Sequence, residues 1–130
     1  MRMIFVNLPV KDLPASRTFF DALGFSFNPE FSGDHGACMI VDENIFVMLL
    51  TEPFFQGFIN GQIADATKAT EVLVALSADS REDVDTMVAK ALAAGGKAWK
   101  PTYAQGPMYG GSFQDLDGHV WEVFHMAAGD

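Results

Sequence analysis

Short apolar runs separated by turn residues, with one helical segment among them, make up the first half of the chain. Pro14 suits the first turn of a helix in which Phe19 and Leu23 share an apolar face beside Phe20. Gly24 can then close this helix in the left-handed conformation. The predicted elements are, in order, a strand at 3–10, the helix, and strands at 25–27, 37–41 and 45–50.

The second half repeats this order. Residues 80–83, Ser-Arg-Glu-Asp, have the form of a capping box, and Gly95 and Gly96 end the helix that it begins. The fold class predicted is therefore α+β, with two weakly similar βαβββ modules in one domain. The remaining predictions for this half are a strand at 70–78, a strand from 98 to 100, a loop or irregular edge at 107–111 and a hairpin at 112–124. Module one spans about 1–52, a connecting loop 53–69 and module two 70–130.

The connecting loop is rich in aromatic residues. Phe54, Phe55 and Phe58 stand among Gly, Asn and Gln residues. A long connection with three aromatic side chains is unlike an inert linker, and we expect a partly ordered loop or short helix that packs on the protein. Two interpretations stay open, a lid over a binding site and a strap that covers the edge of the core.

The segment 112–124 carries the most distinctive pattern. Asp117-Gly118 predicts a two-residue hairpin turn, since Gly supplies the positive φ that such turns need. In the following strand, Glu122 falls on one face with Val120 and Phe124. The opposite face receives His119, Trp121, Val123 and His125. A carboxylate among apolar residues is costly unless water, a metal or a ligand meets it.

Composition limits the possible partners. A chain of 130 residues with 49% hydrophobic residues and 12 Phe fits one globular domain. The net charge of −9 argues against nucleic acid and anionic membranes, which bind clustered Lys and Arg. The single cysteine, Cys38, lies in an apolar run and is interpreted as a buried structural thiol. With no signal peptide and no apolar run long enough to cross a membrane, the predicted location is the cytoplasm.

Several of these segments together resemble the vicinal oxygen chelate superfamily, which includes glyoxalase I, extradiol dioxygenases, and bleomycin- and fosfomycin-resistance proteins. The matching segments are residues 10–16 with Phe19-Phe20, then Leu23-Gly24-Phe25, and finally residues 115–122. The resemblance covers nearly the whole chain. It implies two βαβββ modules whose curled mixed sheets surround a shared cleft, usually in a homodimer.

The resemblance also implies four metal-ligand positions, typically His or Glu, on the first and last strands of each module. Glu122 matches one of them. The other three fall on Phe5, Met48 and Leu73 in this chain. Phe, Met and Leu side chains cannot hold a hard divalent cation. We therefore predict no metal site and no cofactor, with a divalent metal disfavoured.

The candidate site residues follow from these positions. Glu122 is the candidate catalytic residue, as a base, a residual ligand or a hydrogen-bond acceptor, with a partly exposed structural Glu as the alternative. Asn7 is either a polar contact in the cleft or a side chain bonded to neighbouring backbone. The predicted ligand-binding cleft comprises Phe5, Asn7, Met48, Leu73, Tyr109 and Phe124. Aromatic walls with few polar groups suit a flat organic ligand.

Two functions are consistent with this sequence. The first is a metal-independent binding protein of the bleomycin-resistance kind, which holds a small hydrophobic or aromatic molecule in the cleft. The alternative is a lyase, isomerase or dioxygenase of the glyoxalase-like group, in which Glu122 acts as base or as one ligand of an unconventional metal site. The partners expected are a small molecule and a second copy of the chain, with no nucleic acid and no membrane.

Overall fold

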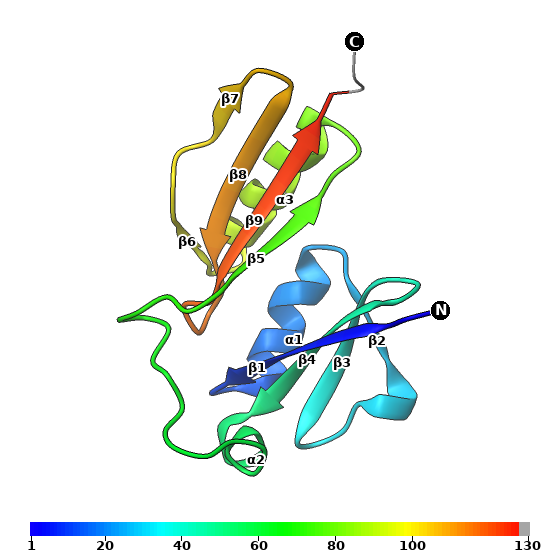
Figure 1. Cartoon of the computed structure of the whole chain (residues 1–130), viewed down its shortest axis with the longest axis vertical. Coiled ribbons are helices and arrows are strands. Elements are labelled where there is room, and N and C mark those ends of the chain that lie inside the picture. Colours follow the sequence, from blue (N-terminus) through cyan, green and yellow to red (C-terminus); the bar gives the residue numbers. More distant parts are fainter. Residues whose placement is uncertain (128–130) are drawn as a thin grey trace. The chain divides into compact units, whose positions relative to one another are not determined.

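Two compact units, each with its own β-sheet, make up the protein in this computed structural model, which describes residues 1–127. The first unit comprises residues 1–64 and the second begins at residue 65. One sheet has four strands and the other five, and helices lie between the strands in the chain order. This mixed α+β architecture confirms the predicted fold class (Figure 1). The first unit has the order β-α-β-β-β before α2, and the second unit has one strand more after its helix, β-α-β-β-β-β.

The first unit has the strand order β1-β4-β3-β2, in which β1 and β4 are parallel and the other neighbours antiparallel. A one-turn helix, α2, follows β4 directly. The elements are β1 (Ile4–Val10), α1 (Leu13–Ala22), β2 (Ser26–Asn28), a 3₁₀ turn (Pro29–Phe31), β3 (Gly36–Asp42), β4 (Ile45–Thr51) and α2 (Glu52–Gln56).

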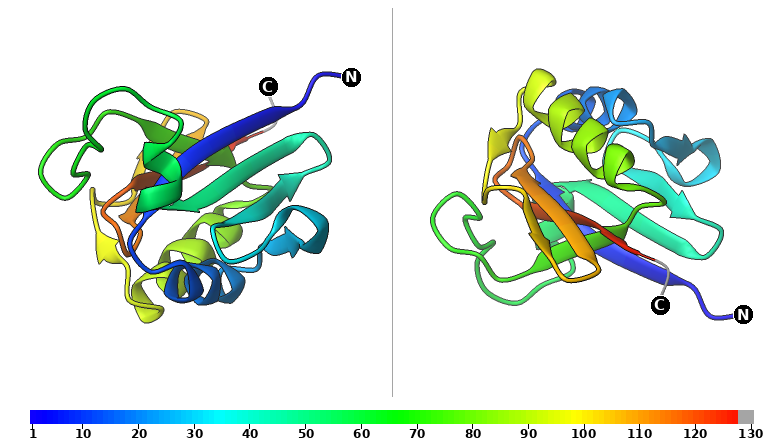
Figure 2. Two further views of the ribbon diagram at one scale, coloured as in Figure 1. Left: turned by 90° about the horizontal axis from the view of Figure 1, so that it is seen from below. Right: turned by 90° about the horizontal axis from the view of Figure 1, so that it is seen from above.

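Local signals set the ends of α1, as the sequence predicts. The Asp12 side chain accepts a hydrogen bond of 3.0 Å from the Ala15 backbone N–H, and Gly24 beyond the helix has a φ of +103°. The buried face of α1 carries Phe19 and Phe20, each 1% exposed. Figure 2 shows α1 lying along one face of the first sheet, so that the opposite face of this sheet is not covered by it.

The second unit has the strand order β5-β9-β8-β6, and β7 pairs with β8 beside β6. Here β5 and β9 are parallel, and β8 is antiparallel to its neighbours. The elements are β5 (Leu73–Ser77), α3 (Arg81–Ala93), β6 (Lys97–Ala98), β7 (Tyr103–Gln105), β8 (Met108–Gln114) and β9 (Val120–Met126).

Helix α3 covers one face of this second sheet (Figure 2). Ser80 caps it by accepting a 3.0 Å hydrogen bond from the Asp83 backbone N–H. Trp121, Phe113 and Val84 are almost completely buried between the helix and the sheet. Trp121 alone removes a large apolar area from water, which makes this layer the main source of stability of the unit.

The segment predicted as a loop or irregular edge, 107–111, is instead mostly regular strand. Strand β8 begins at Met108 and stays paired with β9 through Gly110 and Gly111. Because these two glycines have no side chain, other residues can lie close to β8 on both faces of the sheet. A Cβ on Gly111 would lie 2.8 Å from Val88 of α3, and one on Gly110 would lie 2.7 Å from the Tyr103 ring. The glycines therefore permit close packing rather than breaking the strand.

The connection between β8 and β9 also differs from the prediction. It is a five-residue loop, 115–119, and not a two-residue turn, although Gly118 does have a positive φ of +88°. Asp115, 4% exposed, organises this loop. Its Oδ1 accepts hydrogen bonds of 3.0 Å from the Asp117 and His119 backbone N–H groups, and its Oδ2 accepts one of 3.0 Å from Trp121 Nε1. Burial raises the pKa of Asp115, and these donors oppose that shift.

The aromatic segment after β4 is partly helical, as expected. In α2 the Phe54 ring stacks on His35 with 5.4 Å between ring centroids, and it meets Phe58 edge-on at 5.2 Å. Helix α2 contacts β1 and β4 of its own unit. No helix within residues 1–127 is long and apolar enough to cross a membrane.

Candidate functional site

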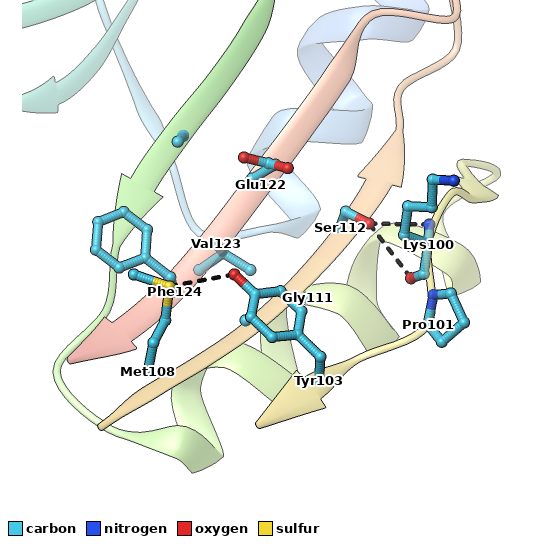
Figure 3. A pocket seen from close by; sticks show the side chains of 11 residues that line it. Lys100, Pro101, Tyr103, Met108, Gly111, Ser112, Glu122, Val123 and Phe124 are labelled. Carbon is cyan, nitrogen blue, oxygen red and sulfur yellow. Dashed lines mark hydrogen bonds between the residues drawn. The ribbon is translucent and has the colours of Figure 1, made fainter. Parts of the chain in front are cut away.

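A pocket of about 350 Å³ opens on the second sheet, on the face opposite α3. Its floor comes from β5, β8 and β9, and its wall from β7 and the segment before it (Figure 3). Side chains that alternate toward the pocket along β8 and β9 share this face because the two strands are paired in register. The lining residues that determine its chemistry are Ala75, Tyr103, Met108, Ser112, Glu122 and Phe124.

Glu122 stands in the middle of the pocket floor, on β9. Its register partners are Ala75 on β5 and Ser112 on β8, both with short side chains. The carboxylate is half-buried and has no hydrogen-bond or ion-pair partner among residues 1–127. Small neighbours leave space beside it, so a bound molecule can reach its oxygens.

Ser112 does not supply a free hydroxyl to the pocket. Its Oγ accepts a 3.0 Å hydrogen bond from the Lys100 backbone N–H and donates one of 3.3 Å to the Lys100 carbonyl oxygen. Both bonds are drawn in Figure 3. With only 6% of its surface exposed, Ser112 serves to attach the segment before β7 to the sheet. The hydroxyl hydrogen of Ser112 is thereby donated within the protein and is not available to a ligand.

One side of the pocket is apolar. The Tyr103 ring lies over Gly110, and its hydroxyl lies 3.2 Å from Met108 Sδ, as a hydrogen-bond donor. Phe124 is the register partner of Gly110 on β9 and points to the same face (Figure 3). Two aromatic rings and a thioether therefore meet above a position that has no side chain.

The structure brings only two of the predicted site residues, Glu122 and Phe124, into this pocket. Tyr109 points to the other face, where its hydroxyl donates a 2.7 Å hydrogen bond to Asp85 of α3 and the Arg81 guanidinium lies 5.0 Å from its ring. The hydrogen bond to Asp85 raises the pKa of Tyr109. The tyrosine that lines the pocket is therefore Tyr103 and not Tyr109.

Leu73 also lies apart from the pocket lining. It is half-exposed and pairs with Val120, whereas Ala75, two residues further along β5, pairs with Glu122. A bulky side chain at position 75 would fill the space beside the carboxylate. The methyl group of Ala75 leaves that space open.

The other three predicted residues, Phe5, Asn7 and Met48, belong to the first unit. They share the face of the first sheet that α1 does not cover, and Asn7 is the register partner of Met48. Phe5 stacks on Phe46 with 4.9 Å between ring centroids. The Asn7 amide Nδ2 donates a 3.2 Å hydrogen bond to the Phe5 carbonyl oxygen, which agrees with the local alternative weighed from the sequence.

The histidines and the cysteine have structural contacts. His125 Nδ1 lies 3.0 Å from the Ala78 carbonyl oxygen, His119 belongs to the loop that Asp115 organises, and His35 stacks on Phe54. Cys38 is buried on β3, and burial raises the pKa of its thiol. A thiol with a raised pKa is a poor nucleophile, in agreement with a structural role.

Alternation along β8 could have identified Ser112 as a pocket residue, since it shares the face of Glu122. Tyr103 and Ala75 could not be found in this way. Tyr103 reaches the pocket because β7 folds back onto β8, and Ala75 is selected by the register of β5 against β9. Both are long-range pairings that leave no local pattern.

Comparison with known proteins agrees with this geometry. The family model described as bleomycin resistance protein-like N-terminal matches residues 2–41. A hypothetical protein from S. aureus has 30% sequence identity and a TM-score of 0.81, over 96% of this chain and 94% of that one. A glyoxalase/bleomycin resistance protein/dioxygenase family enzyme from Burkholderia phytofirmans has 17% identity and a TM-score of 0.79, over 97% and 99%. The fosfomycin resistance protein FosX from Listeria monocytogenes has 19% identity and a TM-score of 0.69, over 96% and 93%. No curated protein matches the chain in sequence.

These matches over nearly the whole chain show that it has the fold of these structures, with a helix on one face of the sheet in each unit. Residues 2–41 match the bleomycin resistance protein-like family model, and the fold is that of glyoxalase/bleomycin resistance/dioxygenase structures, which is consistent with the vicinal oxygen chelate superfamily.

The donor set of this chain does not fit the divalent metal that the superfamily implies. Within residues 1–127, no group of three or more His, Cys, Asp and Glu side chains is placed to hold a metal ion. The register partners of Glu122 and Met48 on the first strands are Ala75 and Asn7, so neither position receives an imidazole or a second carboxylate. One carboxylate provides too few of the ligands that Zn²⁺ or Mg²⁺ requires.

Proposed function

We propose that this protein is a metal-independent binder of a small hydrophobic or aromatic molecule, held in the pocket of the second sheet. The observation that carries the proposal is a formed pocket with an apolar wall and a single uncommitted carboxylate. Tyr103, Met108 and Phe124 provide apolar contact area, and Glu122 provides one oriented polar group. This combination is typical of small-molecule sites, in which a few polar groups orient a mostly apolar ligand.

The pocket volume limits the size of the ligand. A volume of about 350 Å³ lies at the small end of the range for ligand sites. A molecule with one ring and a short substituent fits this space better than a large natural product. The names of similar structures refer to resistance proteins as well as enzymes, which supports a binding role as one candidate.

The alternative function is an enzyme, a lyase, isomerase or dioxygenase of the glyoxalase-like group. Glu122 favours it, because a carboxylate without a partner in a pocket is free to accept a proton from a bound substrate. A single variant, Glu122→Gln, distinguishes the two functions. As a base, Glu122→Gln would abolish turnover of a substrate that still binds; as part of a binding site only, no turnover exists to be lost.

The first experiment is a fragment screen followed by NMR, with backbone amide resonances of β5, β8 and β9 as the readout. We expect single-ring fragments to shift these resonances in a saturable way. In the variant Ala75→Phe, the new ring fills the space beside Glu122, and we expect dissociation constants at least tenfold higher, the equivalent of about 1.4 kcal/mol.

Ala104→Phe is the matched control. Ala104 is exposed on β7 and does not line the pocket, so the same substitution there should leave the affinity unchanged. Absence of any fragment that shifts the pocket resonances would refute the proposal, as would equal affinity of the wild type and Ala75→Phe.

The sequence also predicts a homodimer, a cytoplasmic location and no nucleic-acid partner, and these stay predictions. For the connecting segment, a lid and a strap over the edge of the core both stay open, and the His35–Phe54 stack is a specific contact of this segment within the first unit.

A further inference from the structure

We infer that the group recognised in this pocket is an organic cation, a protonated amine or quaternary ammonium on an apolar body, whose charge pairs with Glu122. This inference rests on the proposed binding function and names the chemical class of the ligand. It follows from which polar groups of the pocket are already bonded, from the character of the wall, and from the position of the nearest positive charge.

The first observation is that the hydroxyl groups facing the pocket are already hydrogen-bonded within the protein. The Ser112 hydroxyl makes both of its hydrogen bonds to the Lys100 main chain, and the Tyr103 hydroxyl donates to Met108 Sδ. The Glu122 carboxylate has no partner among residues 1–127. A ligand beside Glu122 therefore meets a free acceptor and no free hydroxyl donor, and an anionic ligand there would face an unfavourable charge.

The second observation is that no protein cation neutralises Glu122. Lys100 lines the pocket, but its side chain is exposed and forms no ion pair with Glu122. In Figure 3 Lys100 lies on the other side of Ser112 from the Glu122 carboxylate. The charge of Glu122 is thus available to a ligand. An apolar ligand without a positive charge would remove the Glu122 carboxylate from water without compensating it, which is unfavourable for binding.

The third observation is the composition of the wall. Phe124 lies two residues from Glu122 on the same face of β9, and the Tyr103 ring and the Met108 thioether lie beside it. Aromatic faces attract ammonium groups, and a thioether gives soft, polarisable contact. Hydrogen bonds to a charged group are about twice as strong as neutral ones, so Glu122 favours an ammonium over a hydroxyl. The net charge of −9 adds a field that concentrates cations near the protein.

The test compares three probes of one shape: 2-phenylethylamine, 2-phenylethanol and phenylacetate. Each is titrated into the isotope-labelled full chain at neutral pH and low salt, with the pocket amide resonances as readout. We expect the amine to bind at least tenfold more tightly than the alcohol, and phenylacetate to bind most weakly. In Glu122→Gln, which keeps the shape of the side chain, the amine should lose about tenfold to a hundredfold in affinity while the alcohol changes little.

Each other outcome overturns the inference. If the alcohol or phenylacetate binds as tightly as the amine, or if Glu122→Gln affects amine and alcohol equally, the ligand is not selected by charge. If none of the three probes binds while uncharged fragments from the screen do, the cation class is wrong and the binding function stands. If no fragment of any class shifts the pocket resonances, the binding function itself fails.

Discussion

Replacing Asp115 by alanine should lower the free energy of unfolding by about 3 kcal/mol, the largest stability effect we expect of any polar residue in the chain. The substitution leaves the Asp117 and His119 backbone N–H groups and Trp121 Nε1 without their acceptor. The His119 and Trp121 donors are buried, and an unsatisfied buried donor costs about 1–3 kcal/mol. Burial of the Asp115 carboxyl, which raises its pKa, offsets part of this loss.

Urea unfolding of the full chain measures this effect, with Asp115→Asn as the matched control. The Asn side-chain oxygen can still accept from the two backbone donors, but its NH₂ group then faces the indole N–H. We therefore expect Asn to cost about 1–2 kcal/mol, less than alanine. Equal stability of wild type and Asp115→Ala would show that the loop does not depend on this carboxylate.

The second large effect concerns the adjacent glycines of β8. Gly111→Ala should destabilise the protein by about 1–3 kcal/mol, because its Cβ would lie 2.8 Å from Val88 Cγ2 and 3.3 Å from Val84 Cγ1 of α3. Val84 is completely buried, so the helix has little room to move away. The thermal melting temperature of the variant reports this change.

Gly110→Ala is the control for that prediction, one residue away on the other face. Its Cβ would meet the Tyr103 ring at 2.7 Å, but this ring is nearly half-exposed and can turn outward. We expect a stability change below about 1 kcal/mol together with altered ligand affinity, since the displaced ring forms the pocket wall. A larger loss of stability in Gly110→Ala than in Gly111→Ala would contradict the assignment of the two faces of this sheet.

Local signals in the sequence are sufficient to predict the helices and the face of β9 on which Glu122 lies. Asp12 and Pro14 mark the start of α1 and Gly24 its end, each through a physical preference confined to a few residues. Alternation along β9 likewise separates Glu122 and Phe124 from Trp121, because side chains of a regular strand must alternate.

The predictions that failed depended on interactions between distant residues. Gly110 and Gly111 predict a loop, which hides the alternation that would place Tyr109 on the face of α3 in the paired strand. The two-residue turn at Asp117-Gly118 was favoured by its dipeptide, but the side-chain bonds of Asp115 stabilise a wider loop. Neither the contact with α3 nor the bond to Trp121 leaves a local pattern in the sequence.

We propose that the pocket beside Glu122 binds an organic molecule directly, without a metal ion. The most direct test titrates the tightest fragment into protein stripped with a chelator, with the metal content of the same sample measured before and after stripping. We expect little bound metal at the start and an unchanged dissociation constant after stripping. Near-stoichiometric metal, loss of binding on stripping, and recovery with Zn²⁺, Ni²⁺ or Mn²⁺ in the wild type but not in Glu122→Ala would contradict it.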